Sequence, residues 1–224
     1  IEGFTIFNKF FVIEEREGGL VKIRVKTWDG ATDYYIDFGE PAYTASVGAN
    51  PDFDAVTVRY AYTSMTTPSS VFEFDMELRT KTLLKQQEIV GGYNSSDYVT
   101  ERLMVPSHDG VLVPLSIVYN KGVARNGQNP LVLYGYGSYG SSMDAYFSLA
   151  RLSLLDRGFI WAIAHIRGGE EMGRQWYEDG KMLKKKNTFL DFIACAEYLV
   201  TQGYTSKDKM FAMGGSAGGL LVGA

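Results

Sequence analysis

The sequence contains one cysteine, two histidines, six prolines and no long hydrophobic run. The single cysteine, Cys195, excludes an intrachain disulfide and therefore a disulfide-rich scaffold. The apolar run Phe159–Ala164 is far too short to cross a bilayer. Residues Ile1–Phe10 lack a basic start followed by an apolar stretch, so no signal peptide is visible and a cytoplasmic location is expected.

Neither sign of charge dominates. The 26 acidic and 22 basic residues give a net charge of -4, which argues against a general nucleic-acid-binding protein because that function needs a basic face. A hydrophobic content of 46% excludes a mainly disordered chain. The 224 residues allow one large domain or two small ones. The chain starts at Ile1 rather than Met and stops at Ala224 within an apolar stretch, so we expect it to be part of a longer protein.

Charge, glycine and proline are divided unevenly along the chain. Residues 1–90 carry 9 basic and 14 acidic residues, whereas residues 91–224 carry 13 and 12. The first segment contains 6 of the glycines and the second contains 19, and no proline follows Pro130. We therefore predict two structural units, at residues 1–90 and 91–224.

The first unit has the pattern of β-structure. In Leu20–Lys26 apolar and charged residues alternate, so one face of the strand is expected to be buried and the other hydrated. Gly18 and Gly19 suggest a hairpin between this strand and Phe10–Arg16. Further short strands are expected at Asp33–Phe38, Val56–Tyr62 and Val71–Met76. Such a series is typical of a sandwich, a barrel or propeller blades, and by itself predicts a scaffold without chemistry.

Strands and helices alternate in the second unit. Strands are expected at Tyr98–Val105, Val111–Tyr119, Leu131–Tyr134, Phe159–Ala164 and Lys209–Met213. Helices are expected at Ala145–Asp156, from Asn187 to Gly203, and from about Ala217. Thr188 and Asp191 resemble a capping box at the start of the second helix. Buried strands that alternate with helices indicate an α/β fold with a parallel sheet covered on both faces.

A G-x-S-x-G motif, Gly214 to Gly218, follows the last strand and precedes a helix. That context is typical of a nucleophilic serine on a sharp strained turn, with Ser216 as the nucleophile. Side chains at Gly214 or Gly218 would collide with the adjoining strand or helix. The backbone N–H of Ala217, at the start of the helix, is a candidate oxyanion donor. The alternative is a glycine-rich turn that only packs tightly.

A second glycine-rich segment, Gly135–Gly140, has the formal pattern G-x-G-x-x-G of a dinucleotide-binding loop. Tyr136 and Tyr139 would crowd that loop, and no acidic residue for a ribose follows the next strand, although Arg167 could accept a 2′-phosphate. An NADP-binding oxidoreductase is therefore one alternative. In a hydrolase sheet the same loop would supply a second oxyanion donor, the Tyr136 hydroxyl.

Three other features have less specific meanings. The segment Arg167–Gly180 either shapes the site or is a charged, solvated connection. Lys184–Lys186 is expected to be a solvated face, and Cys195 a core residue. No metal ion or cofactor is expected.

The stretch Tyr98–Ala224 resembles the catalytic domain of the prolyl oligopeptidase family of serine peptidases, in its oligopeptidase B branch. The resemblance is carried by Asn129–Gly140, by Ile166–Phe189 and by Gly214–Gly219. The upstream segment Tyr62–Ser70 resembles the last propeller blade of that family. The resemblance implies a β-propeller followed by an α/β-hydrolase domain, and an endopeptidase that cleaves short peptides after Lys or Arg.

The resemblance also implies roles for three residues. Ser216 would be the nucleophile, and Tyr136 and the Ala217 N–H would form the oxyanion hole. In this fold the order along the chain is Ser, Asp, His, yet no Asp or His follows Ser216, and His108 and His165 precede it. The triad Asp and His, and the acidic residues that bind a basic side chain, are therefore expected outside this sequence. The chain alone is expected to be inactive. Short peptides are the expected partners, without nucleic acid or membrane, and a catalytically silent binding module remains a further alternative.

Overall fold

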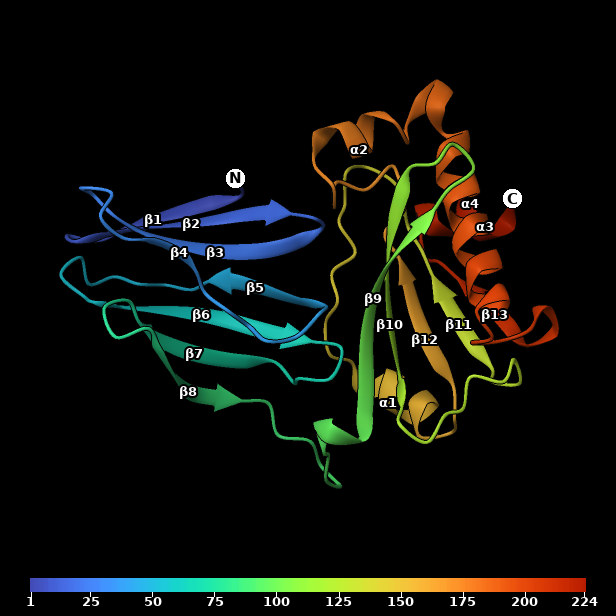
Figure 1. The fold of residues 1–224 in the computed structure, drawn as a ribbon, viewed down its shortest axis with the longest axis horizontal. Helices are drawn as coiled ribbons and strands as arrows, with labels where there is room; N and C mark the ends of the chain where they lie inside the picture. The colour runs from blue at the N-terminus through green and yellow to red at the C-terminus, as the bar shows by residue number, and fades with distance from the viewer.

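The first 86 residues form two antiparallel four-stranded sheets. The computed structural model describes residues 1–224, and Figure 1 shows these two sheets beside a third one. The strands of the first sheet, in spatial order, are β1 (Gly3–Ile6), β2 (Phe10–Glu17), β3 (Leu20–Thr27) and β4 (Asp33–Tyr35). Those of the second are β5 (Tyr43–Val47), β6 (Thr57–Ser64), β7 (Ser70–Asp75) and β8 (Thr80–Gln86).

The hairpin expected around Gly18 and Gly19 is present between β2 and β3. The pairing of Glu17 with Leu20 leaves a two-residue turn, and both glycines have positive φ, at 59° and 79°. Turns of this kind match the twist of antiparallel strands and favour glycine. Val21, Ile23 and Val25 are buried, as the alternation predicted.

The two sheets share one core, and they form the expected part of a propeller. Strands β3 and β5 lie next to each other across the boundary between the sheets. Fourteen buried residues from both sheets form this core, with Phe38 in contact with the rings of Tyr43, Tyr60 and Tyr62. Strands β1, β5 and β8 were not anticipated, and β4 ends at Tyr35, three residues before the predicted end.

The third sheet has five strands: β9 (Tyr98–Pro106), β10 (Leu112–Asn120), β11 (Leu131–Tyr134), β12 (Ile160–Ala164) and β13 (Met210–Met213). Their spatial order is β13-β11-β12-β10-β9. Strand β11 lies parallel to both β12 and β13, whereas β10 is antiparallel to β9 and β12. The sheet is therefore mixed rather than fully parallel, because β9 and β10 form a hairpin before the crossover connections begin.

Helices cover both faces of this sheet. Helix α3 (Lys186–Thr201) packs Phe192, Cys195 and Leu199 on one face, and α1 (Leu149–Leu155) packs Leu155 on the other. The remaining helices, α2 (Arg174–Glu178) and α4 (Ala217–Gly223), lie near the carboxyl ends of the parallel strands (Figure 1). Short 3-10 turns occur at Ser95–Asp97, Met182–Lys184 and Lys207–Lys209. No helix is both long and apolar enough to cross a membrane.

Two helix starts differ from the sequence-based expectation. Residues 145–148 are not helical: the Phe147 N–H donates to Thr63 Oγ1, and Ser148 caps α1 by accepting from the Arg151 N–H. The predicted capping box at Thr188 and Asp191 is wrong. Helix α3 begins at Lys186, and both side chains bind other segments of the chain, as described below.

The boundary predicted after residue 90 falls in the connection between β8 and β9, and remains a prediction. Two polar contacts join residues that lie on opposite sides of this connection. Arg16 on β2 forms an ion pair with Asp144, at 2.8 Å, and the Arg102 guanidinium donates to the Gly18 carbonyl at 2.6 Å. The third sheet is thereby held against the hairpin turn of the first sheet.

Candidate active site

Ser216 lies on the sharp turn between β13 and α4. Its φ of 54° and ψ of -120° are unusual for a residue with a side chain, and such strain persists only where the surroundings enforce it. Gly214 and Gly218 provide that enforcement. A Cβ atom on Gly214 would lie 2.3 Å from the Gly218 carbonyl oxygen, and one on Gly218 would lie 2.8 Å from the Gly135 carbonyl oxygen. The exposed Ser216 side chain is therefore presented by a tightly closed turn, as the motif predicted.

The backbone N–H of Ala217 has no hydrogen-bond partner within the chain. Ala217 is the first residue of α4, whose next two N–H groups, of Gly218 and Gly219, bond to the carbonyls of Gly215 and Ser216. An unpaired N–H beside an exposed hydroxyl is the arrangement that can stabilise a developing oxyanion.

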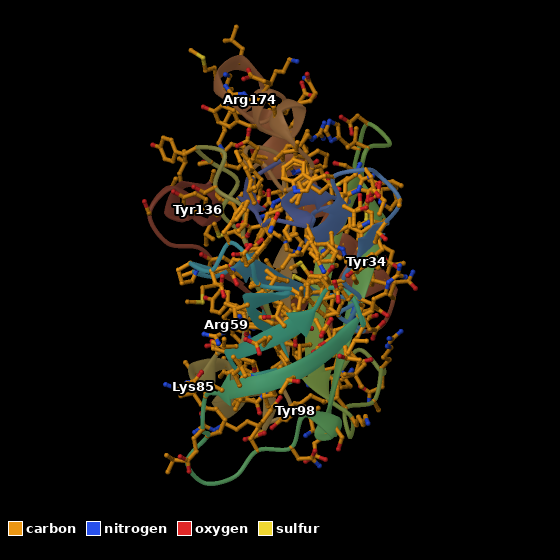
Figure 2. All side chains as sticks on the ribbon, turned by 90° about the vertical axis from the view of Figure 1, so that its left-hand side faces the viewer. Tyr34, Arg59, Lys85, Tyr98, Tyr136 and Arg174 are labelled. Carbon is orange, nitrogen blue, oxygen red and sulfur yellow. The ribbon has the colours of Figure 1, made fainter.

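The Gly135–Gly140 loop lies beside this turn. The Gly135 N–H donates to the Met213 carbonyl at 3.1 Å, which joins the loop to the end of β13. The Tyr136 ring packs against the start of α4, because a Cβ on Gly218 would lie 3.5 Å from its Cδ2 atom. The Tyr136 side chain, labelled in Figure 2, is half-buried, and its hydroxyl forms no hydrogen bond within the chain. The structure thus brings Tyr136, Ser216 and Ala217 to the same edge of the sheet.

The structure contradicts the dinucleotide-binding alternative. The loop does not open a helix, since α1 begins only at Leu149. Gly135 allows close packing rather than approach of a ligand, because a Cβ there would lie 2.8 Å from the Phe192 ring and 2.9 Å from Leu221. The Arg167 guanidinium is buried and engaged by two carboxylates, so it is not free to bind a 2′-phosphate.

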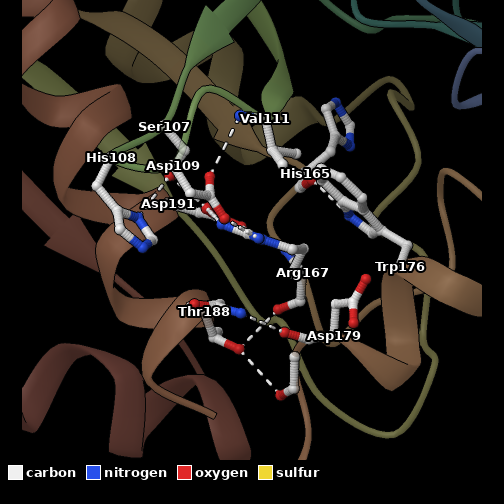
Figure 3. Close-up of polar contacts among 12 residues, drawn as sticks. Ser107, His108, Asp109, Val111, His165, Arg167, Trp176, Asp179, Thr188 and Asp191 are labelled. Carbon is white, nitrogen blue, oxygen red and sulfur yellow. Dashed lines mark hydrogen bonds and ion pairs between the residues drawn. The ribbon is translucent and has the colours of Figure 1, made fainter. Parts of the chain in front are cut away.

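Arg167 is the centre of a buried polar cluster (Figure 3). Its guanidinium donates to Asp191 at 2.6 and 2.8 Å and to Asp109 at 2.6 Å, and its own backbone N–H donates to Asp191 at 3.0 Å. The Ser107 hydroxyl also donates to Asp191, at 2.6 Å. These bonds raise the pKa of Arg167 and, through the guanidinium, lower the pKa of the Asp109 carboxyl. A buried ion pair with this many hydrogen bonds fixes the end of β12 to α3.

Both ends of the segment Arg167–Gly180 are buried against the Tyr136 loop, whereas its middle, Met172–Gln175, is exposed. The Gly168 backbone lies against the backbones of Gly137 and Gly180. A Cβ on Gly168 would lie 2.0 Å from the Gly137 carbonyl oxygen, and a Cβ on Gly180 would lie 2.0 Å from the Gly168 nitrogen. The Thr188 hydroxyl closes the stack by donating to the carbonyls of Arg167 and Gly180, at 2.7 and 3.1 Å (Figure 3). The geometry favours the interpretation that this segment shapes the site.

Neither histidine forms a hydrogen bond with Ser216. His165 is buried, its Nε2 lies 2.8 Å from the Ser116 hydroxyl, and burial lowers its pKa to about 3. His108 bonds to the neighbouring Ser107 hydroxyl at 3.2 Å. Neither histidine is therefore positioned to accept the Ser216 proton.

Sequence reasoning missed two cationic residues near the site. Arg151 lines a cavity of about 700 Å³ together with Tyr134, Trp161 and Gly215, and its Nε has no partner. Burial lowers the pKa of Arg151 to about 10. Lys185 is half-buried, so the expectation of a solvated face at Lys184–Lys186 is wrong for this residue. Neither residue has a motif that marks it. Cys195, in contrast, is a core residue as expected, with its thiol pKa raised by burial.

Two family models match the chain. That of the prolyl oligopeptidase family matches residues 145–224, and that of the N-terminal β-propeller domain of prolyl oligopeptidase matches residues 1–87. Among curated proteins, dipeptidyl aminopeptidase BI of Pseudoxanthomonas mexicana is 51% identical over 100% of the chain, and protease 2 of Moraxella lacunata is 46% identical over 97%. The chain covers 31% of each.

A solved structure is similar over the whole chain. Oligopeptidase B from Trypanosoma brucei, in a closed form with covalently bound antipain, superimposes with a TM-score of 0.90 and is 41% identical. The match covers 100% of this chain and 33% of that one. The chain thus spans about a third of the length of the relatives it matches.

Proposed function

This chain belongs to the prolyl oligopeptidase family, and on that premise we propose that the full-length polypeptide is a serine endopeptidase that cleaves short peptides after Lys or Arg. Ser216 is the nucleophile in this proposal, and the Tyr136 hydroxyl and Ala217 N–H bind the oxyanion. The observation that carries it is the strained turn at Ser216, which leaves the hydroxyl exposed and the next N–H unpaired.

The chemistry needs one group that the chain does not provide. Ser216 Oγ would attack the scissile carbonyl carbon while a base accepts the hydroxyl proton, because a serine hydroxyl is a poor nucleophile without one. The carbonyl oxygen, now negatively charged, would be held by Tyr136 and Ala217. We infer that the base is a histidine oriented by an aspartate, both supplied by residues of the full-length polypeptide outside this chain. No cofactor has a step in this mechanism.

Cleavage after basic residues is what the resemblance to the oligopeptidase B branch implies, and proteins named protease 2 and oligopeptidase B are among those similar to this chain. A second candidate is removal of dipeptides from a free N-terminus, supported by the 51% identity to a dipeptidyl aminopeptidase. The two candidates share the nucleophile and differ in what binds the substrate's α-amino group.

Two substrates and one label test the proposal on the full-length polypeptide. A fluorophosphonate should label the wild type but not Ser216→Ala, and an absence of Ser216-dependent labelling would refute a serine peptidase. A chromogenic Arg-ended dipeptide with a blocked N-terminus should be hydrolysed. If only the same dipeptide with a free N-terminus is hydrolysed, the dipeptidyl aminopeptidase candidate replaces the endopeptidase.

A further inference from the structure

Lys185 differs from the two lysines beside it. Lys184 is exposed and forms an ion pair with Asp179, at 2.6 Å, and Lys186 is also exposed. The Lys185 side chain instead turns inward, where its Nζ donates to the Gly137 carbonyl and, at 2.9 Å, to the Ser138 hydroxyl. No carboxylate lies within 4.0 Å of this ammonium group, and its burial lowers the pKa of Lys185. Burying a cation without a counter-ion costs free energy, which hydrogen bonds to neutral acceptors offset only in part.

The two acceptors of Lys185 directly follow Tyr136. On the other side of the tyrosine, the Gly135 N–H is bonded to β13. Hydrogen bonds therefore hold the chain on both sides of Tyr136: the Gly135 N–H donates one, and the Lys185 side chain donates the others. The backbone at Gly137 also packs closely against Thr188, since a Cβ there would lie 2.4 Å from Thr188 Cγ2.

We propose that Lys185 is a positioning residue for the oxyanion hole: its hydrogen bonds to Gly137 and Ser138 hold the loop after Tyr136 so that the tyrosine hydroxyl points to the site beside Ser216. This inference rests on the proposed function of Ser216 and Tyr136. A hydroxyl held in this way would bind the negative charge that develops on the substrate oxygen. An interaction of this kind acts in the transition state more than in the bound substrate, so its removal lowers kcat more than it raises KM.

The test compares Lys185→Met with Lys184→Met in the full-length polypeptide. Loss of one oxyanion donor costs about 10²–10³ in kcat, and a displaced donor should cost less, about 10–100-fold. We expect that loss in Lys185→Met with little change in KM, no loss in Lys184→Met, and recovery of most of kcat in Lys185→Arg. Equal activity of Lys185→Met and Lys184→Met would overturn the proposal.

A double-mutant cycle with Tyr136→Phe distinguishes positioning from a general loss of structure. If Lys185 acts through the Tyr136 hydroxyl, Lys185→Met should cost about threefold or less in kcat once that hydroxyl is gone, because coupled residues are not additive. The same loss in both backgrounds would show that Lys185 does not act through Tyr136. If Lys185→Met does not fold, as judged by its thermal midpoint, Lys185→Gln takes its place in the cycle.

The fluorophosphonate label distinguishes a failure of the proposed function from a failure of the proposed role of Lys185. Labelling that does not depend on Ser216 would overturn the proposed function itself. Labelling that depends on Ser216, together with a Lys185→Met variant as active as Lys184→Met, would overturn only the role of Lys185.

Discussion

The sheets of residues 1–86 and the sheet of residues 98–213 are held together in different ways. The first two share an apolar core with several aromatic rings, and most of their ion pairs lie at the surface, such as Arg24 with Asp33. The third sheet also has an apolar core, but its loops are fixed by buried charges and by glycines whose backbones touch. The comparison shows that the scaffold relies on burial of apolar area, whereas the candidate site relies on specific polar contacts and close backbone approach.

The largest expected effect tests whether the chemistry belongs to the second region alone. In the full-length polypeptide, Ser216→Ala should lower kcat by about a millionfold, the effect of removing the nucleophile from a serine peptidase. Ser46→Ala, an exposed serine in the first region, should leave kcat unchanged. The measurement is hydrolysis of the Arg-ended chromogenic substrate.

The isolated 224-residue chain should not hydrolyse that substrate at all, because neither of its histidines contacts Ser216. It should also aggregate readily, since β13 pairs with β11 alone and leaves Phe211 and Met213 half exposed. Steady turnover that is lost in Ser216→Ala, measured on the purified chain, would contradict the Ser-Asp-His order assumed here.

Glycine substitutions should have different consequences in the two regions. Gly214→Ala places a Cβ 2.3 Å from a backbone oxygen that cannot move without opening the turn, so fluorophosphonate labelling of Ser216 should be lost. Gly30→Ala has open space around it and only a positive φ of 74°, so it should cost about 1–2 kcal/mol of stability and leave labelling intact. Retained labelling in Gly214→Ala would show that the turn is less constrained than the structure indicates.

Ion pairs should also differ between the regions. In Asp191→Asn the buried Arg167 guanidinium loses the negative charge of its buried partner. Loss of one partner of a buried ion pair lowers the free energy of unfolding by about 3–5 kcal/mol. Asp33→Asn breaks an exposed pair with Arg24, so the loss should be much smaller and should shrink further in high salt. Denaturant unfolding of the two variants at low and high salt measures the difference, and equal losses would remove the distinction between the regions.

A further expected effect is a pH dependence from Glu171, which is buried in the second region. Burial raises the pKa of Glu171 to about 7, so its contribution to stability is complete below the ordinary value near 4.5 and is lost as pH rises through 7. His165, 4.0 Å away, has a lowered pKa and contributes in the opposite sense, losing stability as pH falls below about 6.5.

Glu171→Gln removes only the first of these contributions. The thermal midpoint of Glu171→Gln should therefore rise relative to that of the wild type between pH 5 and pH 8. Glu170→Gln, at a neighbouring position whose side chain is 40% exposed, is the matched control and should show no such trend. A constant difference between Glu171→Gln and the wild type across this range would mean that Glu171 is ionised throughout.

The sequence alone was sufficient to predict the elements that have strong local patterns. The β2–β3 hairpin, the strand Leu131–Tyr134 and the turn at Ser216 were all predicted, because alternation and glycine spacing are local signals. The start of α1 was misplaced because Phe147 is held by Thr63, a contact across 84 residues. The capping box was misread for the same reason, since Thr188 and Asp191 bind segments that the local pattern does not contain.

The site was predicted in part. Ser216, Tyr136 and Ala217 stand out because glycines surround them, and their catalytic roles stay a proposal. Lys185 and Arg151 carry no such mark. Lys185 lies in a run of three lysines. It is the one whose side chain turns inward, because of the backbone geometry just before α3. Which lysine of a run is buried depends on helix phase and loop packing, and these are not local properties.

The contact among Gly137, Gly168 and Gly180 constrains how this protein can change over generations. An enlarged residue in an ordinary core can be accommodated when a neighbour becomes smaller. At Gly168 and Gly180 the neighbours are backbone atoms, which cannot be removed by a substitution. No single compensating substitution is available for either position, so we expect these two glycines to be inherited together.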